Sequence, residues 1–374
     1  MSYGRDTFPI IQIYENLCVG VKNCYNIGNG AWPNGRASAL GAEGSEFESR
    51  CPDMHMDTIQ AILPSFTFLH RLDREYISDE RGDLLTVLSP VFYTPQPFVS
   101  LILSLNLPAG YNGSVLSEVQ VLQGNAWSKF FKLAWYGAEE HYSFAQQTDA
   151  AASLDVDELK LTSPAQAYRF KLSVKGKRAV PKSALVCVSP QSRPDKTFLE
   201  LPTGICEIEV RPFSQMQLNA TPDMQKRLCS PTSLCMALNA LGVLETPLQT
   251  AQAVYDTRAD IYGNWTLNTA YASSKGLFTG VTRFESFAQL GDCVNAESLV
   301  VASIAYQKGE LTGAAAEKTP GHLVLICGWE GNKIRVADPA AATADQVIRF
   351  YDSEEFARAW LVNKRGVAYL VRKK

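Results

Sequence analysis

The stretch DMQKRLCSPTSLCMALNALG, residues 223–242, decides how the C-terminal half of the chain is interpreted. It opens on polar residues, reaches Cys229, passes Pro231, and then becomes apolar at helical spacing. Proline suits the first turn of a helix, where its missing N–H costs no hydrogen bond. We therefore predict a helix that begins at Cys229. A cysteine there faces unpaired backbone N–H groups and the positive end of the helix dipole, and both stabilise its thiolate.

A nucleophilic cysteine needs a base, and the base needs a group that orients it. His322 opens the segment GHLVLICGWEGNKIRVADPA, whose two apolar runs flank a turn signal and predict a β-hairpin. If the turn centres on Glu330 and Gly331, His322 lies opposite or nearly opposite Asp338, on the same face of the ladder. One hairpin would then supply both an imidazole and a carboxylate. The alternative is a core histidine and an aspartate that merely ends a strand.

The first half of the chain has a different pattern. In YRFKLSVKG, residues 168–176, apolar side chains alternate with polar ones, which is the period of a half-buried strand. Similar runs are KFFKLAWYG, PFVSLILSLNLP and KSALVCVSP, at residues 129–137, 97–108 and 182–190. We predict an antiparallel β-sandwich, jelly-roll-like, for residues 1–200, as a binding or scaffolding domain.

After a connector rich in proline, SPQSRPDKTFLELPTG, the patterns become mixed. Beyond the helix at Cys229, helix signals occur in AQAVYDTRADIY and in NTAYASSKGL, the latter stopped by Gly276. Strand-like runs follow in SLVVASIAY, GHLVLICGWE and NKIRVADP. Residues 201–374 are therefore expected to form an α+β domain, helices first and sheet after.

Composition excludes several classes of protein. The 374 residues carry a formal net charge of -3, and lysine and arginine are scattered, so we expect no nucleic-acid partner. No apolar run approaches the roughly 20 residues that span a bilayer, so no transmembrane segment is expected. The location stays open: cytoplasmic if the sequence is complete, secreted or periplasmic if an export signal was removed.

Five segments carry a resemblance to a known family. SQM, CSPTSLCMALNALG, GNWTLNTAYASSKGL, GHLVLICGW and VADPA occur here in the order found in the double-glycine peptidase-like family, a branch of the papain-like cysteine peptidases. The resemblance extends from about Phe213 to the C-terminus. The β-rich half resembles the domain that precedes such peptidases in many bacterial proteins. The resemblance implies a papain-like fold for residues 201–374 and cysteine peptidase activity, without metal or cofactor.

Carried over by position, the resemblance assigns a role to each site residue. Cys229 is the nucleophile, His322 the general base and then acid, and Asp338 the residue that orients His322. A glutamine upstream of the cysteine serves the oxyanion hole; Gln215 is the better match, and Gln225 remains open. Relatives often carry tryptophan before the cysteine, where this chain has Leu228, so the shape of the cleft is expected to differ.

The expected function is hydrolysis of peptide or isopeptide bonds in a peptide or protein substrate, and acyl transfer would use the same residues. The alternative is a catalytically idle papain-like protein that binds a glycan or protein through its β-sandwich. Two smaller features carry less weight. Trp265, Asn268 and Tyr271 are interpreted as packing residues more readily than as cleft residues. The alternating CPDMHMD, residues 51–57, lacks the second ligand pair that a zinc site requires.

Overall fold

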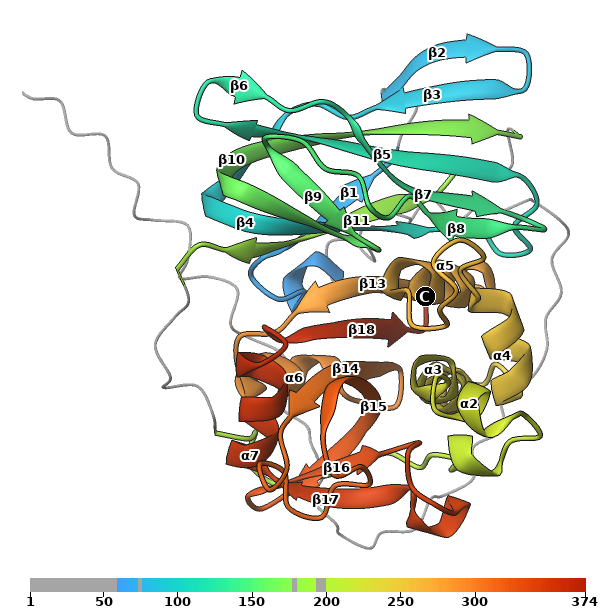
Figure 1. Cartoon of the computed structure of the whole chain (residues 1–374), viewed down its shortest axis with the longest axis vertical. Coiled ribbons are helices and arrows are strands. Elements are labelled where there is room, and N and C mark those ends of the chain that lie inside the picture. The colour runs from blue at the N-terminus through green and yellow to red at the C-terminus, as the bar shows by residue number, and fades with distance from the viewer. Residues whose placement is uncertain (1–58, 73–75, 177–179, 193–199) are drawn as a thin grey trace, which may run out of the picture. The chain divides into compact units, whose positions relative to one another are not determined.

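Two antiparallel sheets dominate the structure (Figure 1), a computed structural model that describes residues 59–72, 76–176, 180–192 and 200–374. All of these residues belong to one unit of the chain, residues 51–374. In the described residues the first sheet has eleven strands: seven follow the order β1-β11-β4-β10-β5-β7-β8, and β2, β3, β6 and β9 pair beside this path. The second sheet has seven strands: six follow the order β13-β18-β14-β15-β16-β17, and β12 pairs with β15. The candidate zinc segment at residues 51–57 lies outside the described residues.

The strands of the first sheet are β1 Thr67–Arg71, β2 Ile77–Arg81, β3 Leu84–Leu88, β4 Phe92–Asn106, β5 Ser114–Gln123, β6 Ala126–Trp127, β7 Phe131–Gly137, β8 His141–Ser143, β9 Ala152–Asp155, β10 Glu158–Lys175 and β11 Ser183–Pro190. Those of the second sheet are β12 Ile205–Glu207, β13 Phe278–Arg283, β14 Ser298–Tyr306, β15 Thr319–Glu330, β16 Lys333–Ala337, β17 Ile348–Asp352 and β18 Val367–Arg372. The helices are α2 Pro222–Gln225, α3 Cys229–Ala240, α4 Pro247–Val254, α5 Trp265–Ser274, α6 Phe287–Cys293 and α7 Ser353–Ala357, with short helical turns η3 Gln215–Gln217, η4 Ala344–Gln346 and η5 Arg358–Val362.

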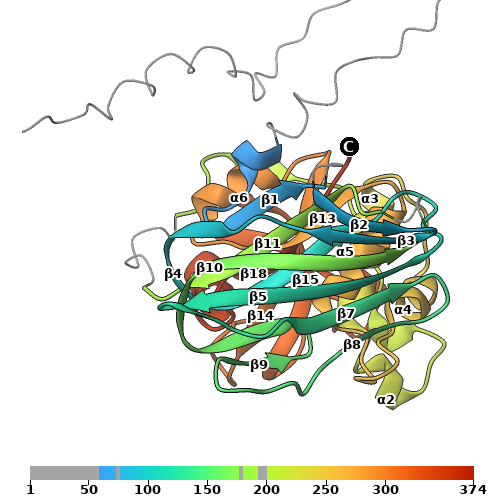
Figure 2. The ribbon, with the colours of Figure 1, turned by 90° about the horizontal axis from the view of Figure 1, so that it is seen from above.

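Alternation in β10 confirms the strand predicted from YRFKLSVKG. Tyr168, Phe170, Leu172 and Val174 are all buried, and the residues between them are not. This strand lies beside β5, which in turn pairs with β7, and Figure 2 shows the three running side by side. The runs predicted at β4, β7 and β11 are also confirmed as strands of this antiparallel sheet. A jelly-roll is not confirmed, since all eleven strands join one sheet.

Strand β11 and the part of β4 from Phe98 onward are largely buried on both faces. Leu103 and Val186 belong to the core of the first sheet, whereas their neighbours Ile102 and Leu185 pack into the cores beside the second sheet. Such double burial produces continuous apolar runs. It explains why LILSL and SALVCV contain few polar residues, and it makes these strands the layer on which the second sheet rests.

Hydrogen bonds fix the second sheet against this layer. The side-chain amide of Asn106 donates to the Thr279 carbonyl at 2.8 Å and accepts from the Thr279 N–H at 2.9 Å. The Val281 N–H donates to Ser104 Oγ at 3.1 Å. A buried amide that satisfies both backbone groups of another strand specifies one register. The division into domains 1–200 and 201–374 stays a prediction. The buried contacts of Asn106 and Ser104 join residues on the two sides of that boundary.

One predicted helix is shorter than the sequence pattern indicated. A helix signal was identified in the segment AQAVYDTRADIY; α4 occupies only its first part and ends at Val254, and residues 255–262 form a loop. Asp256 explains the difference, because its carboxylate accepts from the N–H groups of Arg258 and Ala259, at 3.1 and 3.0 Å. Aspartate competes in this way for the backbone amides that a continuing helix would use.

The hairpin β15–β16 contains one extra residue. Glu330 pairs with Lys333 around a turn at Gly331 and Asn332, so the turn lies one position later than predicted. The register then shifts between Ile326 and Gly328. Cys327 is thus a β-bulge, which changes the face on which all later residues lie. Continued beyond its last pair, Leu325 with Ala337, the new register sets Asp338 opposite Val324, two residues from His322 and on the same face.

Gly328 follows the bulge and lies directly against β12. Its φ is +145°, and a Cβ there would overlap the Cys206 carbonyl. We predict that Gly328→Ala lowers the free energy of unfolding by about 3 kcal/mol. The matched control is Gly331→Ala, at φ +59° with open space around it, which should cost only about 1 kcal/mol. Denaturant unfolding of both variants measures this, and equal losses would contradict the packing argument.

Candidate active site

Helix α3 begins at Cys229, as predicted, with Pro231 in its first turn. The residues from Ser230 to Leu238 are all buried, and the helix packs against β15 and α5. Cys229 itself is half-buried. The thiol therefore lies at the accessible end of a helix that is otherwise enclosed. Leu228, where relatives often have tryptophan, is fully buried and so does not shape an exposed cleft wall.

His322 and Asp338 are in direct contact. The distance from His322 Nε2 to Asp338 Oδ1 is 2.7 Å, and Asp338 is fully buried. The contact runs diagonally across the hairpin, as the bulge at Cys327 requires, instead of between directly opposed residues. Because Nε2 faces the carboxylate, Nδ1 is the ring nitrogen that remains for the thiol, and His322 lowers the pKa of Cys229.

The charges of these three groups support one another. Burial opposes ionisation of Cys229, but the hydrogen bond and charge of His322 outweigh it and lower the pKa of the thiol. Burial would lower the pKa of His322, yet the charge and hydrogen bond of Asp338 raise it overall. Burial would raise the pKa of Asp338, and His322 lowers it. All three directions favour a thiolate beside an imidazolium.

Tyr351 is a site residue that the sequence patterns did not reveal. Its hydroxyl donates to Asp338 Oδ2 at 2.7 Å, and the Ala340 N–H donates to Oδ1 at 2.9 Å. Both carboxylate oxygens are thereby held. Tyr351 lies on β17, opposite Ile334 of β16. In IRFYD, residues 348–352, alternation groups Tyr351 with Arg349 and not with Ile348 and Phe350, so no local pattern indicated that Tyr351 is buried. Its position follows only once β17 is known to extend the hairpin.

Gln215 and Gln225 occupy different positions. Gln215 is buried, its N–H donates to the Pro339 carbonyl at 2.8 Å, and its side-chain amide donates to the Gln225 carbonyl at 2.8 Å. Gln215 Oε1 is buried without a hydrogen-bond partner among the described residues. The side-chain amide of Gln225 is used elsewhere, on the Leu218 carbonyl at 2.8 Å. Gln215 therefore lies beside the loop that follows Asp338, and the choice between the two glutamines stays a prediction.

The residue after the cysteine is held by a buried network. Ser230 Oγ lies 2.9 Å from Asn268 Oδ1 and 2.7 Å from the Tyr369 hydroxyl. Asn268 is fully buried, and its amide also donates to the Asn264 carbonyl at 2.7 Å. Asn268 is thus a packing residue that fixes the start of α3. Trp265 is not only a packing residue, because it also lines a pocket that contains charged side chains such as Arg283 and Lys364.

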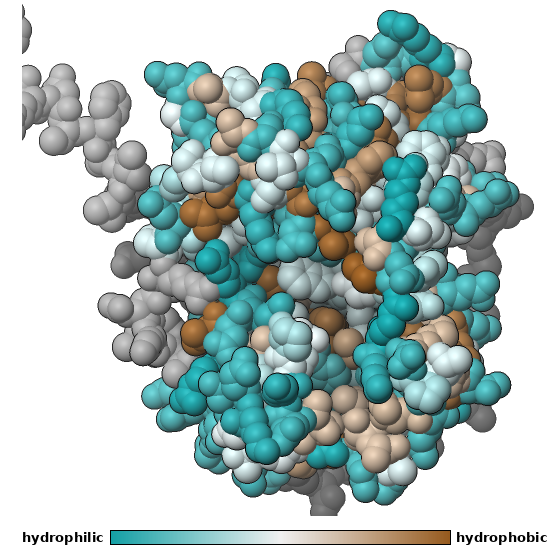
Figure 3. Space-filling view, in the orientation of Figure 1, coloured by the Kyte–Doolittle hydropathy of each residue, from teal (hydrophilic) through white to brown (hydrophobic). Residues whose placement is uncertain are grey.

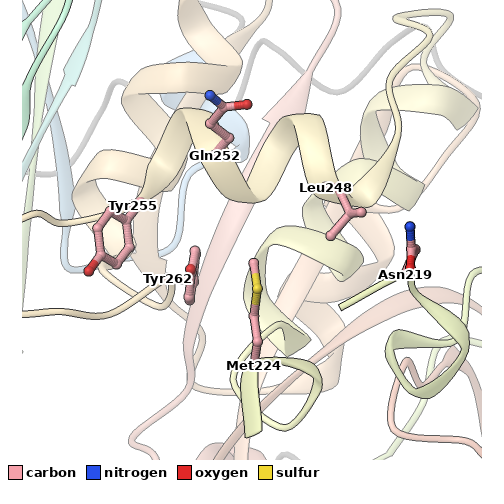
Figure 4. Close-up of a pocket in the computed structure, with 6 residues that line it drawn as sticks. All are labelled: Asn219, Met224, Leu248, Gln252, Tyr255 and Tyr262. Atoms are coloured by element: carbon pink, nitrogen blue, oxygen red, sulfur yellow. The ribbon is translucent and has the colours of Figure 1, made fainter. Parts of the chain in front are cut away.

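A second pocket flanks the segment that leads into Cys229. It has a volume of about 370 Å³ and is lined by Asn219, Met224, Leu248, Gln252, Tyr255 and Tyr262. Figure 4 shows these side chains, which come from α2, α4 and the two loops beside them. The Tyr255 and Tyr262 rings are 4.9 Å apart. The pocket is thus bounded by apolar and aromatic groups with two amides at its edge.

Comparison with known proteins gives a family. Residues 207–367 match the Peptidase_C39 like family. The structure is similar to a double glycine motif protease from an AMS/PCAT transporter, solved in complex with the leader peptide, at 17% identity over 45% of this chain and 95% of that one, with a TM-score of 0.33. It is also similar to the peptidase domain of Streptococcus ComA, a bifunctional ABC transporter involved in quorum sensing, at 14% identity over 45% and 99% of the two chains, with a TM-score of 0.31. No curated protein matches.

None of the described helices combines the length and apolar character needed to cross a membrane. Within the described residues, histidine, cysteine, aspartate and glutamate do not gather into a group of three or more that could hold a metal ion.

Because its pKa is lowered, Cys229 should react with iodoacetamide below the pH at which ordinary thiols, with a pKa of about 8.5, do so. In His322→Ala the rate near neutral pH should fall about tenfold or more, since the thiolate loses its partner. Adduct mapping by mass spectrometry measures each cysteine separately. Cys206, also half-buried, is the internal control. Equal rates at Cys206 and Cys229 would contradict the assignment.

Tyr351→Phe should shift the acidic limb of Cys229 alkylation toward higher pH. The tyrosine hydrogen bond lowers the pKa of Asp338, so its loss lets Asp338 take up a proton at higher pH and uncouples His322 earlier. The matched control is Tyr306→Phe, because the Tyr306 hydroxyl bonds the Ala316 carbonyl at 3.1 Å instead of the carboxylate. The same shift in both variants would refute a specific role for Tyr351.

Proposed function

Because this chain belongs, through residues 207–367, to the Peptidase_C39 like family, we propose that it is a cysteine peptidase that hydrolyses peptide bonds through Cys229, His322 and Asp338. The observation that carries the proposal is the buried 2.7 Å contact of His322 with Asp338, next to a thiol of lowered pKa. A nucleophile, a base and an orienting carboxylate are thus held by α3, β15 and the end of β16. This is the set that acyl transfer requires.

The proposed reaction has two stages. In the first, Cys229 Sγ attacks the carbonyl carbon, and the C–N bond breaks as His322 gives its proton to the leaving amine. The product is a thioester on Cys229. In the second stage, His322 takes a proton from water, the hydroxide adds to the thioester, and the thiol is released with the acid product. Isopeptide cleavage, or transfer to an amine in place of water, would use the same groups.

Oxyanion stabilisation is assigned to the backbone N–H of Cys229 and the side-chain amide of Gln215. The position of Gln215 beside the Asp338 loop supports this choice, because its backbone donates to the Pro339 carbonyl at 2.8 Å. In the resting structure its amide donates to the Gln225 carbonyl. An oxyanion donor is worth about 3 kcal/mol in the transition state, which corresponds to a rate factor of about 100.

Cleavage of a synthetic peptide library, followed by mass spectrometry, tests the proposal. Cys229→Ala should abolish cleavage, whereas Cys206→Ala, a half-buried cysteine outside the site, should retain it. Asp338→Asn should slow cleavage by about 100-fold or more, because His322 loses its orienting charge. If no member of the library is cleaved while Cys229 still carries a reactive thiolate, the chain is a binding protein with an idle site.

The two glutamines provide a matched pair. Gln215→Ala should lower kcat by about 100-fold with Cys229 alkylation unchanged, because it removes an oxyanion donor and not the base. Gln225→Ala should change kcat little, since the proposal assigns its side chain no contact with the oxyanion. The reverse result would transfer the oxyanion role to Gln225.

A further inference from the structure

A charged pocket lies where the first sheet meets the second. Its volume is about 410 Å³, and its charged side chains are Glu158, Lys160, Arg283, Lys364 and Arg365, with Trp265 on one wall. Glu158 and Lys160 come from β10 of the first sheet, and the other four belong to residues 207–367. We call this the cationic pocket. The face of the molecule in Figure 3 is mostly hydrophilic, with hydrophobic residues in small separate groups.

The cationic pocket adjoins the candidate active site. A Cβ placed on Gly321, the residue before His322, would lie 3.6 Å from Lys364 Nζ. The same ammonium group lies 5.8 Å from the centre of the Trp265 ring. Trp265 begins α5, whose Asn268 contacts Ser230 beside the nucleophile. An extended peptide advances about 3.3 Å per residue, so the substrate positions to be tested are those within about three residues of the scissile bond.

The positive charges of the cationic pocket are only partly neutralised. Arg283 forms a buried ion pair with Glu158, and Lys160 pairs with Asp155 at 2.6 Å in an exposed contact. Arg365 donates to the neutral Ser189 hydroxyl at 3.1 Å. The ammonium group of Lys364 faces the Trp265 ring and forms neither a hydrogen bond nor an ion pair with any residue that the structure describes.

The carboxylate of Asp157 also lies near Lys364, but it does not neutralise the remaining positive charge of the cationic pocket. Asp157 is half-buried and accepts a hydrogen bond from the Trp265 N–H. Burial raises the pKa of Asp157 to about 7, so it is only partly charged at neutral pH. Lys364 is half-buried, and burial lowers the pKa of its ammonium group even though the charge of nearby Glu158 opposes the shift, so the desolvation of Lys364 is only partly offset. A ligand that brings a negative charge would remove that cost.

We propose that the cationic pocket binds a carboxylate of the peptide substrate through Lys364 and Arg365, so that the chain prefers substrates with an acidic group close to the scissile bond. This inference rests on the proposed peptidase function. It also assigns a part in recognition to the first sheet, because Glu158 and Lys160 of β10 line the cationic pocket. The carboxylate is that of an acidic side chain or that of a peptide C-terminus, since both present the same two oxygens.

The experiment compares matched synthetic peptides that differ only in a glutamate or glutamine at each of the three positions on either side of the bond, with free or amidated C-termini. In the wild type the acidic member should be cleaved about tenfold faster at one position. This ratio should fall to about one in Lys364→Met and return in Lys364→Arg. Lys175→Met, at the other end of β10, should keep the wild-type ratio. An advantage that disappears on amidation identifies the terminal carboxylate as the ligand.

Binding without turnover separates the two proposals. Fluorescence anisotropy of the same labelled peptides with Cys229→Ala measures the acid-to-amide preference independently of cleavage. Cleavage without any such preference, or a preference unchanged in Lys364→Met, would contradict carboxylate binding in the cationic pocket and leave the proposed peptidase activity intact. Absence of cleavage together with an acid preference that needs Lys364 would support the pocket and overturn the peptidase. Absence of any preference in binding as well as in cleavage would refute the pocket.

Discussion

The extra residue in β15 is the constraint on which the candidate site depends. Without the bulge at Cys327, the turn at Gly331 and Asn332 would place Asp338 on the opposite face from His322. With it, the two side chains meet at 2.7 Å. The bulge is held by close packing, because Gly328 lies against the backbone of β12 where no side chain fits. The geometry of the proposed catalysis therefore rests on a local irregularity in a ladder.

The burial of His322 and Asp338 determines how they act on the Cys229 thiol. Asp338 is enclosed and bonded at both oxygens, so it stays charged and holds the imidazole in one orientation. The imidazole in turn lowers the pKa of Cys229, although burial alone would raise it. The helix α3 presents the thiol, while its buried face and the contact of Ser230 with Tyr369 prevent the helix start from moving. The charges and the packing therefore both favour a Cys229 thiolate beside a His322 imidazolium.

Secondary structure could be predicted from the sequence where a pattern of apolar and polar residues repeats within one element. Alternation predicted β10 with its buried face, and the helix beginning at Cys229 followed from Pro231 and the apolar spacing. The contact of His322 with Asp338 was expected from hairpin pairing, but the turn position was wrong by one and the bulge was not foreseen. A bulge depends on what packs against the strand, here β12, which is distant in sequence. Tyr351 and the cationic pocket were missed for the same reason, since each is created by elements that meet only in the fold.

The central claim is that Cys229 forms a covalent acyl-enzyme assisted by His322. Rapid acid quenching during reaction with an activated peptide ester, followed by intact-mass and peptide-mapping spectrometry, tests it directly. We expect a transient mass increase equal to the acyl group, located on Cys229 and strongly reduced in His322→Ala. Acylation spread over several cysteines, or independent of His322, would contradict it.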